Sequence, residues 1–282
     1  MRPLSVSVLV TSFQPFCPVA SNKQSSESGS VAALRAGNSR GSSRGAGPGA
    51  WENIKAILWT LAIFLAIRTF LFEAYRIPSG SMIPTLLVGD WLFVNKLAYG
   101  PHVPGTEINL PGYTDPKRGD VVVFISPNQI DQPEDPNPTL VKRCVAIAGD
   151  TIWMRDGVFH VNGMPQPQGF PGSKNVKGDG TFSHPLFAWQ KPFEVHGTNA
   201  GEPAASPTLD NWGPLVVPAK HLFMLGDNRY DSKDARYWGF VPRENVRGRP
   251  SFVYYSYNAD DSDRMLPFLT DIRWGRLGTV IR

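Results

Sequence analysis

The 282-residue sequence has only two cysteines, Cys17 and Cys144, and few charged residues. Two cysteines exclude a disulfide-rich scaffold and a cysteine-rich zinc site. Charged residues make up 18% of the chain, below the ~25% of an ordinary soluble domain. Glycine and proline are abundant by contrast, with 27 and 26 residues. This abundance disfavours an all-helical bundle and favours short strands joined by turns.

Long apolar segments are also scarce, and the clearest one covers residues 54–72. A helix of that length would extend about 28 Å, close to the ~30 Å hydrocarbon core of a bilayer. Lys55 and Arg68 lie near its ends, where long cationic side chains reach the membrane surface. Trp51 and Tyr75 flank it as interfacial aromatic residues. Because the apolar residues cover every helical face, we predict one transmembrane helix at residues 54–73; the alternative is a buried helix of a soluble domain.

The residues before this segment have little that could form a core. Residues 21–50 are rich in Ser, Gly and Ala and nearly devoid of aromatic residues, so burial cannot offset the entropy of ordering them. We predict a disordered tail at residues 1–53. Two alternatives stay open: residues 4–10 as the apolar core of a cleaved signal peptide, and the whole region as an organellar transit peptide.

The positive charge is concentrated at the same end of the chain. Residues 1–72 carry seven Lys and Arg against two acidic residues, whereas the rest carries 21 against 22. Arg35, Arg40, Arg44 and Lys55 precede the apolar segment, and the positive-inside rule then predicts a cytoplasmic N-terminus. The net charge of +4 is therefore a signal of membrane topology and gives no support to nucleic-acid binding.

The remaining residues, 74–282, predict a mainly β domain outside the membrane. Short β-rich runs bounded by Gly, Pro, Asp or Asn occur repeatedly, and Arg155-Asp156-Gly157 predicts a hairpin turn between two of them. Residues 162–219 show little periodicity and predict a loop-rich segment with uncertain strands. The predicted strands cover residues 90–95, 120–126, 140–147, 151–154 and 157–161.

Directly after the apolar segment, the sequence Ser79-Gly80-Ser81 lies between two prolines, Pro78 and Pro84. The prolines restrict the backbone and the glycine permits a tight turn. Such a rigid segment suits the presentation of a serine hydroxyl and a backbone N–H to one carbonyl group. The competing interpretation is an ordinary turn, for which this composition is common.

A nucleophilic serine needs a base. The five histidines lie in no recognisable triad context, and the Gly-x-Ser-x-Gly and Ser-x-x-Lys motifs are absent. Lys142 lies in a predicted strand, where burial would lower its pKa and supply a neutral amine; the alternative is a solvent-facing strand lysine. Lys142 and Arg143 point to opposite strand faces, so we predict that at most one of them is buried.

The third candidate region covers residues 226–240 and combines turn formers, charges and aromatic residues. We predict a buried polar network in which Asp227 or Asp234 pairs with Arg229 or Arg236. Ser232 would then donate to or accept from the lysine and orient it. The alternative is a solvated loop. No His-Glu-x-x-His motif or cysteine pair indicates a metal.

Taken together, these regions resemble type I signal peptidase, the membrane-bound leader peptidase of bacteria, over residues 54–282. The resemblance is carried by the apolar segment and by five motifs in the family's order: Ser79–Thr85, Arg118–Phe124, Lys142-Arg143 with Ala148–Asp150, Gly226–Arg236 and Asp271–Arg276.

The resemblance implies an antiparallel β catalytic domain with an inserted cap region, preceded by one transmembrane helix. The catalytic core would cover residues 74–97, 118–150 and 220–282, and the loop-rich insertion residues 151–219. The family's site residues would be Ser81 as nucleophile, Lys142 as general base, Ser79 with the Ser81 N–H as oxyanion hole, Ser232 as the lysine-orienting group, Asp234 with Arg236 as a structural salt bridge, and Ile77 and Val141 as pocket walls.

The resemblance also implies the biology of the reaction. The substrates would be exported preproteins with small residues at −1 and −3 relative to the cut, and no cofactor or metal is expected. The protein would lie in the bacterial inner membrane beside the secretion translocon, with lipids as further partners. Apolar residues such as Trp212, Leu266 and Trp274 could contact lipid, although core packing is the favoured interpretation.

Some positions depart from the family pattern. Ala235 stands where many members have Ser, and Tyr230-Asp231 replaces the commoner Asp-Asn. The chain has one predicted span, whereas some relatives have two. It also has no cysteine pair for the disulfide that some members carry. Two other functions stay open: a self-cleaving Ser/Lys peptidase, which normally carries a DNA-binding helix pair that residues 1–53 lack, and an inactive membrane-anchored β scaffold.

Overall fold

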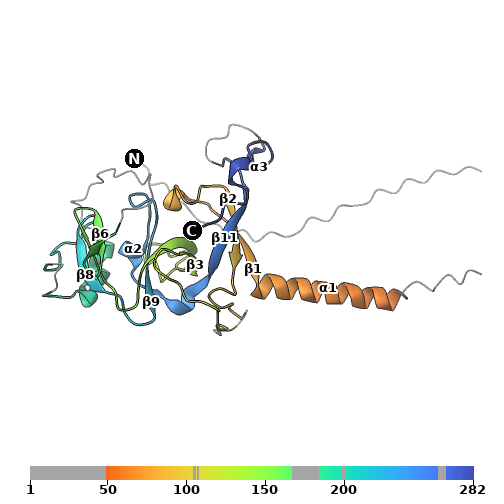
Figure 1. Cartoon of the computed structure of the whole chain (residues 1–282), viewed down its shortest axis with the longest axis horizontal. Coiled ribbons are helices and arrows are strands. Elements are labelled where there is room, and N and C mark those ends of the chain that lie inside the picture. Colours follow the sequence, from red (N-terminus) through yellow and green to blue (C-terminus); the bar gives the residue numbers. More distant parts are fainter. Residues whose placement is uncertain (1–48, 104–105, 107, 167–183, 198–200, 260–264) are drawn as a thin grey trace, which may run out of the picture. The chain divides into compact units, whose positions relative to one another are not determined.

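The computed structural model describes residues 49–103, 106, 108–166, 184–197, 201–259 and 265–282. Most of the predicted disordered tail, residues 1–48, lies outside this range, as do residues 167–183 of the predicted insertion. The chain divides into two compact units, one ending at Ala62 and one covering Ile63–Arg282. The second unit contains all of the β structure (Figure 1).

The apolar segment forms α1, Ala50–Phe70. Residues Trp51–Phe70 are long and apolar enough to cross a membrane, and none of that stretch is buried within the protein. The helix ends three residues before the predicted boundary at residue 73, because β1 (Phe72–Arg76) pairs antiparallel with β2 (Asp90–Asn95). Tyr75 accordingly lies in a strand and packs against a hydrophobic core cluster.

The larger sheet has seven strands in the order β1-β2-β11-β3-β4-β9-β10, and every neighbouring pair is antiparallel. The predicted strands at 90–95, 120–126 and 140–147 correspond to β2, β3 and β4. The sequence reasoning named no strand at β1, β9, β10 or β11. The bounds of the remaining members are β3 Val121–Ile125, β4 Thr139–Ile147, β9 His221–Leu225, β10 Val241–Pro242 and β11 Val246–Ser256.

The predicted loop-rich insertion contains a second antiparallel sheet, ordered β7-β6-β5-β8. Its strands are β5 Thr151–Arg155, β6 Val158–Val161, β7 Met164–Pro165 and β8 Trp212–Val216. The predicted hairpin turn joins β5 to β6, with positive φ at Asp156 and Gly157. The described part of residues 162–219 is therefore more regular than its composition indicates, because β8 pairs with β5 across sequence-distant residues.

Short helical turns connect the sheets. They are the 3₁₀ turns η1 Gly80–Met82, η2 Pro185–Phe193, η3 Arg243–Asn245 and η4 Trp274–Arg276, and the α-helical turns α2 Ala235–Trp238 and α3 Pro267–Thr270. Trp212 is fully buried in the cluster between the two sheets, as the core-packing interpretation predicts. Leu266 and Trp274 are instead 45% and 72% exposed, so that interpretation was wrong for them.

Candidate active site

Ser81 lies in the middle of the turn η1, directly after β1. Ser79 precedes the turn in an extended conformation. Met82 and Leu86 are almost fully buried and anchor the segment in the core. The backbone carbonyl of Ser81 accepts a hydrogen bond from the Asn228 N–H at 3.1 Å, and the Gly80 carbonyl accepts one from the Asn228 side chain at 3.2 Å. The loop after β9 therefore holds the serine turn in place.

Lys142 lies in β4 and is buried, with 3% of the residue exposed. Its Nζ lies 2.5 Å from Ser81 Oγ. The two residues are separated by 61 positions in the sequence, and packing of η1 on β4 brings them together. A buried lysine in direct contact with a serine hydroxyl is the arrangement in which a neutral amine can accept the serine's proton.

The surroundings of Lys142 favour that neutral amine. Burial lowers the pKa of Lys142 from 10.5 to about 8, while the carboxylate of Asp234 opposes this shift and Arg236 adds to it. Desolvation dominates because a buried ammonium loses its hydration. About one amine in eleven is then unprotonated at pH 7.

The Ser79 hydroxyl and the Ser81 N–H are the two donors predicted to form an oxyanion hole. Ser79 Oγ is 3.4 Å from Ser81 Oγ, so both hydroxyls face the same small space. The Ser81 N–H belongs to the first residues of a helical turn, which have no acceptor within the turn.

The predicted polar network is present, with one change of partners. Asp234 pairs with Arg236 at 2.8 Å and accepts the Gly226 N–H at 3.0 Å, all fully buried. Burial alone would raise the pKa of Asp234, but Arg236 holds that pKa below its usual value. Within the described ranges, Arg229 pairs with no carboxylate; it donates to the Gly226 carbonyl at 3.0 Å, and burial lowers its pKa to about 10.

Asp227 pairs with Arg143 instead, through two contacts of 2.8 Å. It also accepts a hydrogen bond from the Thr85 hydroxyl at 2.6 Å. Both Lys142 and Arg143 are buried, 3% and 5% exposed, so the prediction that at most one is buried was wrong. The alternation of faces holds, but protein covers β4 on both sides and Asp227 compensates the second charge.

Ser232 is buried beside the site, but its hydroxyl makes no hydrogen bond among the described residues. The expected contact with Lys142 is not formed. Ser232 instead packs against Gly226, where an added Cβ would lie 2.1 Å from Ser232 Oγ and 2.6 Å from the Ser81 carbonyl oxygen. Gly226 thus permits the close approach of the three segments.

Ile77 and Val141 belong to one hydrophobic cluster, which also includes Met82 beside the serine. Strand β9 pairs only with Arg143–Ile147 of β4. In the described part of the chain, the edge of Thr139–Lys142 that faces away from β3 has no strand partner. An unpaired strand edge therefore ends at Lys142, beside the predicted pocket residues.

Sequence reasoning missed three residues that hold the site together: Thr85, Gly226 and Asn228. All three lie within motifs quoted for the resemblance, but a turn-forming residue gives no sequence signal of which carbonyl or carboxylate it contacts. Among the described residues, no three His, Cys, Asp or Glu side chains cluster as metal ligands. Cys144 is buried and forms no disulfide with any described residue. Cys17, the other cysteine of the chain, lies outside the described residues.

Comparison with known proteins finds relatives that are similar in sequence. A signal peptidase I of Pseudomonas fluorescens is 35% identical over 214 residues, which are 72% of each chain. One of Aquifex aeolicus (strain VF5) is 32% identical over 231 residues, 72% of this chain and 83% of the relative. A crystal structure of a signal peptidase I from Enterococcus faecalis V583 matches 48% of this chain and 96% of its own, at 27% identity and a TM-score of 0.28. The family model described as signal peptidase, peptidase S26, matches residues 50–255, and the chain therefore belongs to the signal peptidases of peptidase family S26.

Proposed function

We propose that Ser81 and Lys142 are the nucleophile and general base with which this serine endopeptidase removes signal peptides from preproteins. The observation that carries the proposal is the 2.5 Å contact between Ser81 Oγ and the buried Lys142 Nζ. Burial lowers the pKa of this lysine to about 8, so some of the neutral amine is present near pH 7 and can act as the base.

The reaction follows from these positions. Ser81 Oγ attacks the carbonyl carbon of the residue before the cut, and the neutral amine of Lys142 accepts the hydroxyl proton. The Ser79 hydroxyl and the Ser81 N–H donate to the oxyanion; losing one such donor typically costs roughly 3–4 kcal/mol. Lys142 then protonates the leaving amine, and water, deprotonated by Lys142, hydrolyses the acyl-enzyme. The resemblance assigns Ser232 to orienting Lys142, a role that requires a hydrogen bond that is not formed in this structure.

The unpaired edge of β4 suits an extended peptide. A preprotein segment that adds along Thr139–Lys142 would form main-chain hydrogen bonds and deliver its scissile carbonyl to Ser81. Ile77 and Val141 would then form shallow apolar pocket walls. Such walls admit only small side chains, which supports a preference for small residues at −1 and −3.

Helix α1 supports membrane anchoring. With the basic residues before it in the cytoplasm, the β domain from residue 74 would lie on the outer side of the bacterial inner membrane. That placement puts the site where signal peptides emerge, beside the translocon.

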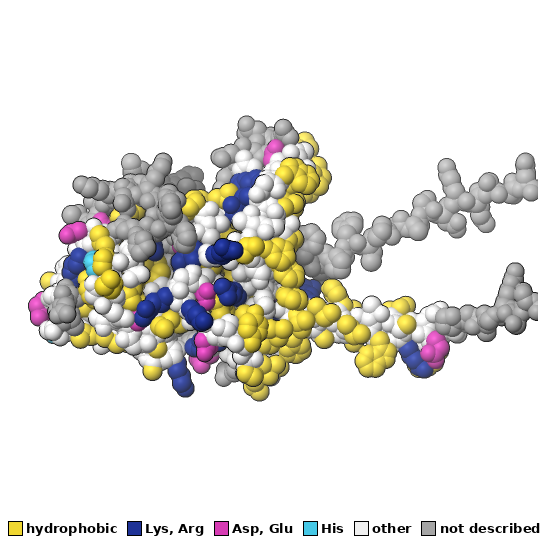
Figure 2. Space-filling model, in the orientation of Figure 1, with side chains coloured by type: hydrophobic (Ala, Val, Ile, Leu, Met, Phe, Trp, Pro, Cys, Tyr) yellow, Lys and Arg dark blue, Asp and Glu magenta, His cyan; other side chains and the backbone are white. Residues whose placement is uncertain are grey.

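Exposed apolar residues near the C-terminus support contact with lipid. Met265, Leu269 and Trp274 are 95%, 62% and 72% exposed. Figure 2 shows hydrophobic side chains along α1 and around α3. Replacing Leu269 and Trp274 by Ser in a version lacking residues 1–70 would reduce its partition onto phospholipid vesicles, and unchanged partition would contradict this contact.

The dyad is tested with purified full-length Ser81→Ala and Lys142→Ala and a preprotein substrate. Both variants lose cleavage, whereas the matched controls Ser251→Ala and Lys117→Ala, outside the site, keep it. Full cleavage by either dyad variant would refute the assignment. A self-cleaving peptidase would instead lose its own N-terminal segment and leave the preprotein intact, and an inactive scaffold would cleave neither.

A further inference from the structure

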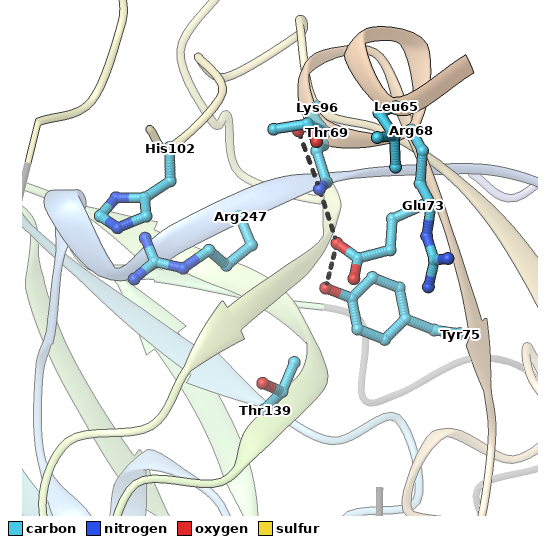
Figure 3. Close-up of a pocket in the computed structure, with 9 residues that line it drawn as sticks. All are labelled: Leu65, Arg68, Thr69, Glu73, Tyr75, Lys96, His102, Thr139 and Arg247. Atoms are coloured by element: carbon cyan, nitrogen blue, oxygen red, sulfur yellow. Dashed lines mark hydrogen bonds and ion pairs between the residues drawn. The ribbon is translucent and has the colours of Figure 1, made fainter. Parts of the chain in front are cut away.

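A pocket of about 440 Å³ lies at the end of α1, away from Ser81 and Lys142. All of its walls belong to the second unit of the chain. Figure 3 shows the side chains of α1 and β1 on one side and those of Arg247 and His102 on the other. The lining residues are Leu65, Arg68, Thr69, Glu73, Tyr75, Lys96, His102, Thr139 and Arg247.

The charges in this pocket do not balance. Glu73 is its only carboxylate and already has two partners: Lys96 Nζ at 2.9 Å and the Tyr75 hydroxyl at 2.8 Å. Lys96 also donates to the Thr69 carbonyl at 3.1 Å, which fixes it against the last turn of α1. Two further cations line the pocket: Arg68, which is exposed, and Arg247, which is half-buried.

Neither arginine has a carboxylate partner among the residues that the structure describes. Arg247 donates to the Glu244 backbone carbonyl at 2.9 Å. Burial lowers the pKa of Arg247, and Tyr75 and Glu73 only partly oppose this. A guanidinium held in a half-buried position without its own anion is stabilised by an anion that enters the pocket.

The position of the pocket identifies the anion. Leu65, Arg68 and Thr69 belong to the final turns of the helix that is apolar enough to cross a membrane. If α1 crosses the bilayer, its last turn lies where the hydrocarbon ends and the lipid phosphates begin. Phosphate diesters of lipid are then the most concentrated anions beside the pocket, and an arginine fork matches their oxygens.

We propose that this pocket binds the phosphate headgroup of an anionic phospholipid between Arg68 and Arg247. The inference rests on the proposed membrane anchoring by α1. Thr139 at the pocket begins the unpaired edge of β4 that ends at Lys142, and Tyr75 lies two residues before Ile77. A bound headgroup would thus hold both strands that flank the active site at the bilayer surface.

The test uses the full-length chain in nanodiscs of phosphatidylcholine with a minor share of phosphatidylglycerol. After transfer to detergent, native mass spectrometry counts the lipids that stay bound. Wild type retains phosphatidylglycerol in preference to phosphatidylcholine. Arg68→Gln/Arg247→Gln lowers this retention roughly 25-fold, since each cation near an anionic lipid contributes about a fivefold factor.

A matched variant, Lys117→Gln/Lys191→Gln, removes the same charge from exposed positions outside the pocket and retains phosphatidylglycerol as wild type does. If both variants lost phosphatidylglycerol equally, net charge alone would explain its retention, and the proposal would be overturned. Equal retention of the two lipids by wild type would also overturn it, and this comparison needs no variant to fold.

Two further arms separate other ligands from lipid. Displacement of phosphatidylglycerol by millimolar inorganic phosphate would show a free-phosphate site rather than a lipid site. Lower kcat/KM of Arg68→Gln/Arg247→Gln in pure phosphatidylcholine would assign the pocket to the peptide substrate. Retention requires no turnover and is measured equally in Ser81→Ala, so failure of the lipid site and failure of the proposed catalytic dyad are distinguishable.

Discussion

The lowered pKa of Lys142 predicts a specific loss of activity in acid. The buried amine must be neutral to accept the Ser81 proton, and burial places its pKa at about 8. As the pH falls below this value, protonation removes the base from the free enzyme. We therefore expect kcat/KM to decrease with falling pH, about tenfold for each pH unit below 8.

The magnitude follows from the neutral fraction. With a pKa of about 8, roughly one lysine in eleven is neutral at pH 7, whereas a lysine of pKa ~10.5 would be neutral in only about one molecule in 3,000. Burial therefore increases the amount of active base about 300-fold. The corresponding free energy, about 3 kcal/mol, is borne by the folded state, which excludes water from the ammonium.

The assay is the pH dependence of kcat/KM for a preprotein or a signal-peptide substrate, with enzyme stability checked across the same range. A single ionisation with a midpoint near 8 supports the reasoning. Constant activity down to about pH 5, or a midpoint near the ordinary lysine value of ~10.4, would refute it.

The same shift has a consequence for stability, with a definite sign. Because the pKa is lower in the folded state, the unfolded chain binds more protons between pH 8 and about 10.5, and stability rises with pH in that window. Below it the buried ammonium costs the folded state up to about 3 kcal/mol. Lys142→Met removes that cost, so the inactive variant is more stable than wild type at pH 7 in denaturant unfolding.

The other predictions concern neighbouring groups. Ser79→Ala lowers kcat about 10²–10³-fold with KM little changed, and Ser79→Thr restores part of it; a change confined to KM would contradict the oxyanion role. Ser232→Ala leaves thermal stability unchanged because the Ser232 hydroxyl has no hydrogen-bonding partner in the described part of the chain. If this hydroxyl orients Lys142 during the reaction, the variant has a lower kcat/KM and a shifted pH midpoint; unchanged kinetics would remove that role. Asp227→Asn breaks the buried pair with Arg143 and costs about 3–5 kcal/mol in denaturant unfolding, and a loss below about 1 kcal/mol would show that the pair does not hold the site.

The sequence was sufficient to predict the apolar helix, the central strands and the proximity of Ser81 and Lys142. Strands β2, β3 and β4 have β-rich runs between turn formers, so their local sequence indicates their structure. Strands β1 and β8 do not. Strand β1 follows the apolar helix with no turn-forming residue before it, and β8 contains Gly213 and Pro214. Their pairing partners, β2 and β5, determine them, and pairing over such distances is invisible to local patterns.

The error over Arg143 has a similar origin. Alternation along a strand predicts opposite faces but not whether both are covered. Whether a second charge can be buried depends on a carboxylate from a distant segment, here Asp227, 84 residues away. The same limit applies to Ser232. Its place near the site could be predicted, but its hydrogen-bonding partner could not, because that partner depends on the conformation of the loop after β9.

The two buried ion pairs explain why burial dominates the pKa of Lys142. Asp234 raises this pKa and Arg236 lowers it, and because the two charges are paired at 2.8 Å, their fields at the amine largely oppose each other. Asp227 is paired with Arg143, but Asp227 and Asp231 still raise the pKa of Lys142 by smaller amounts than burial lowers it. An unpaired carboxylate in the same place would stabilise the ammonium and remove the base. The charged groups of this network thus connect the serine turn to the loop after β9. Desolvation nevertheless remains the largest influence on the pKa of Lys142.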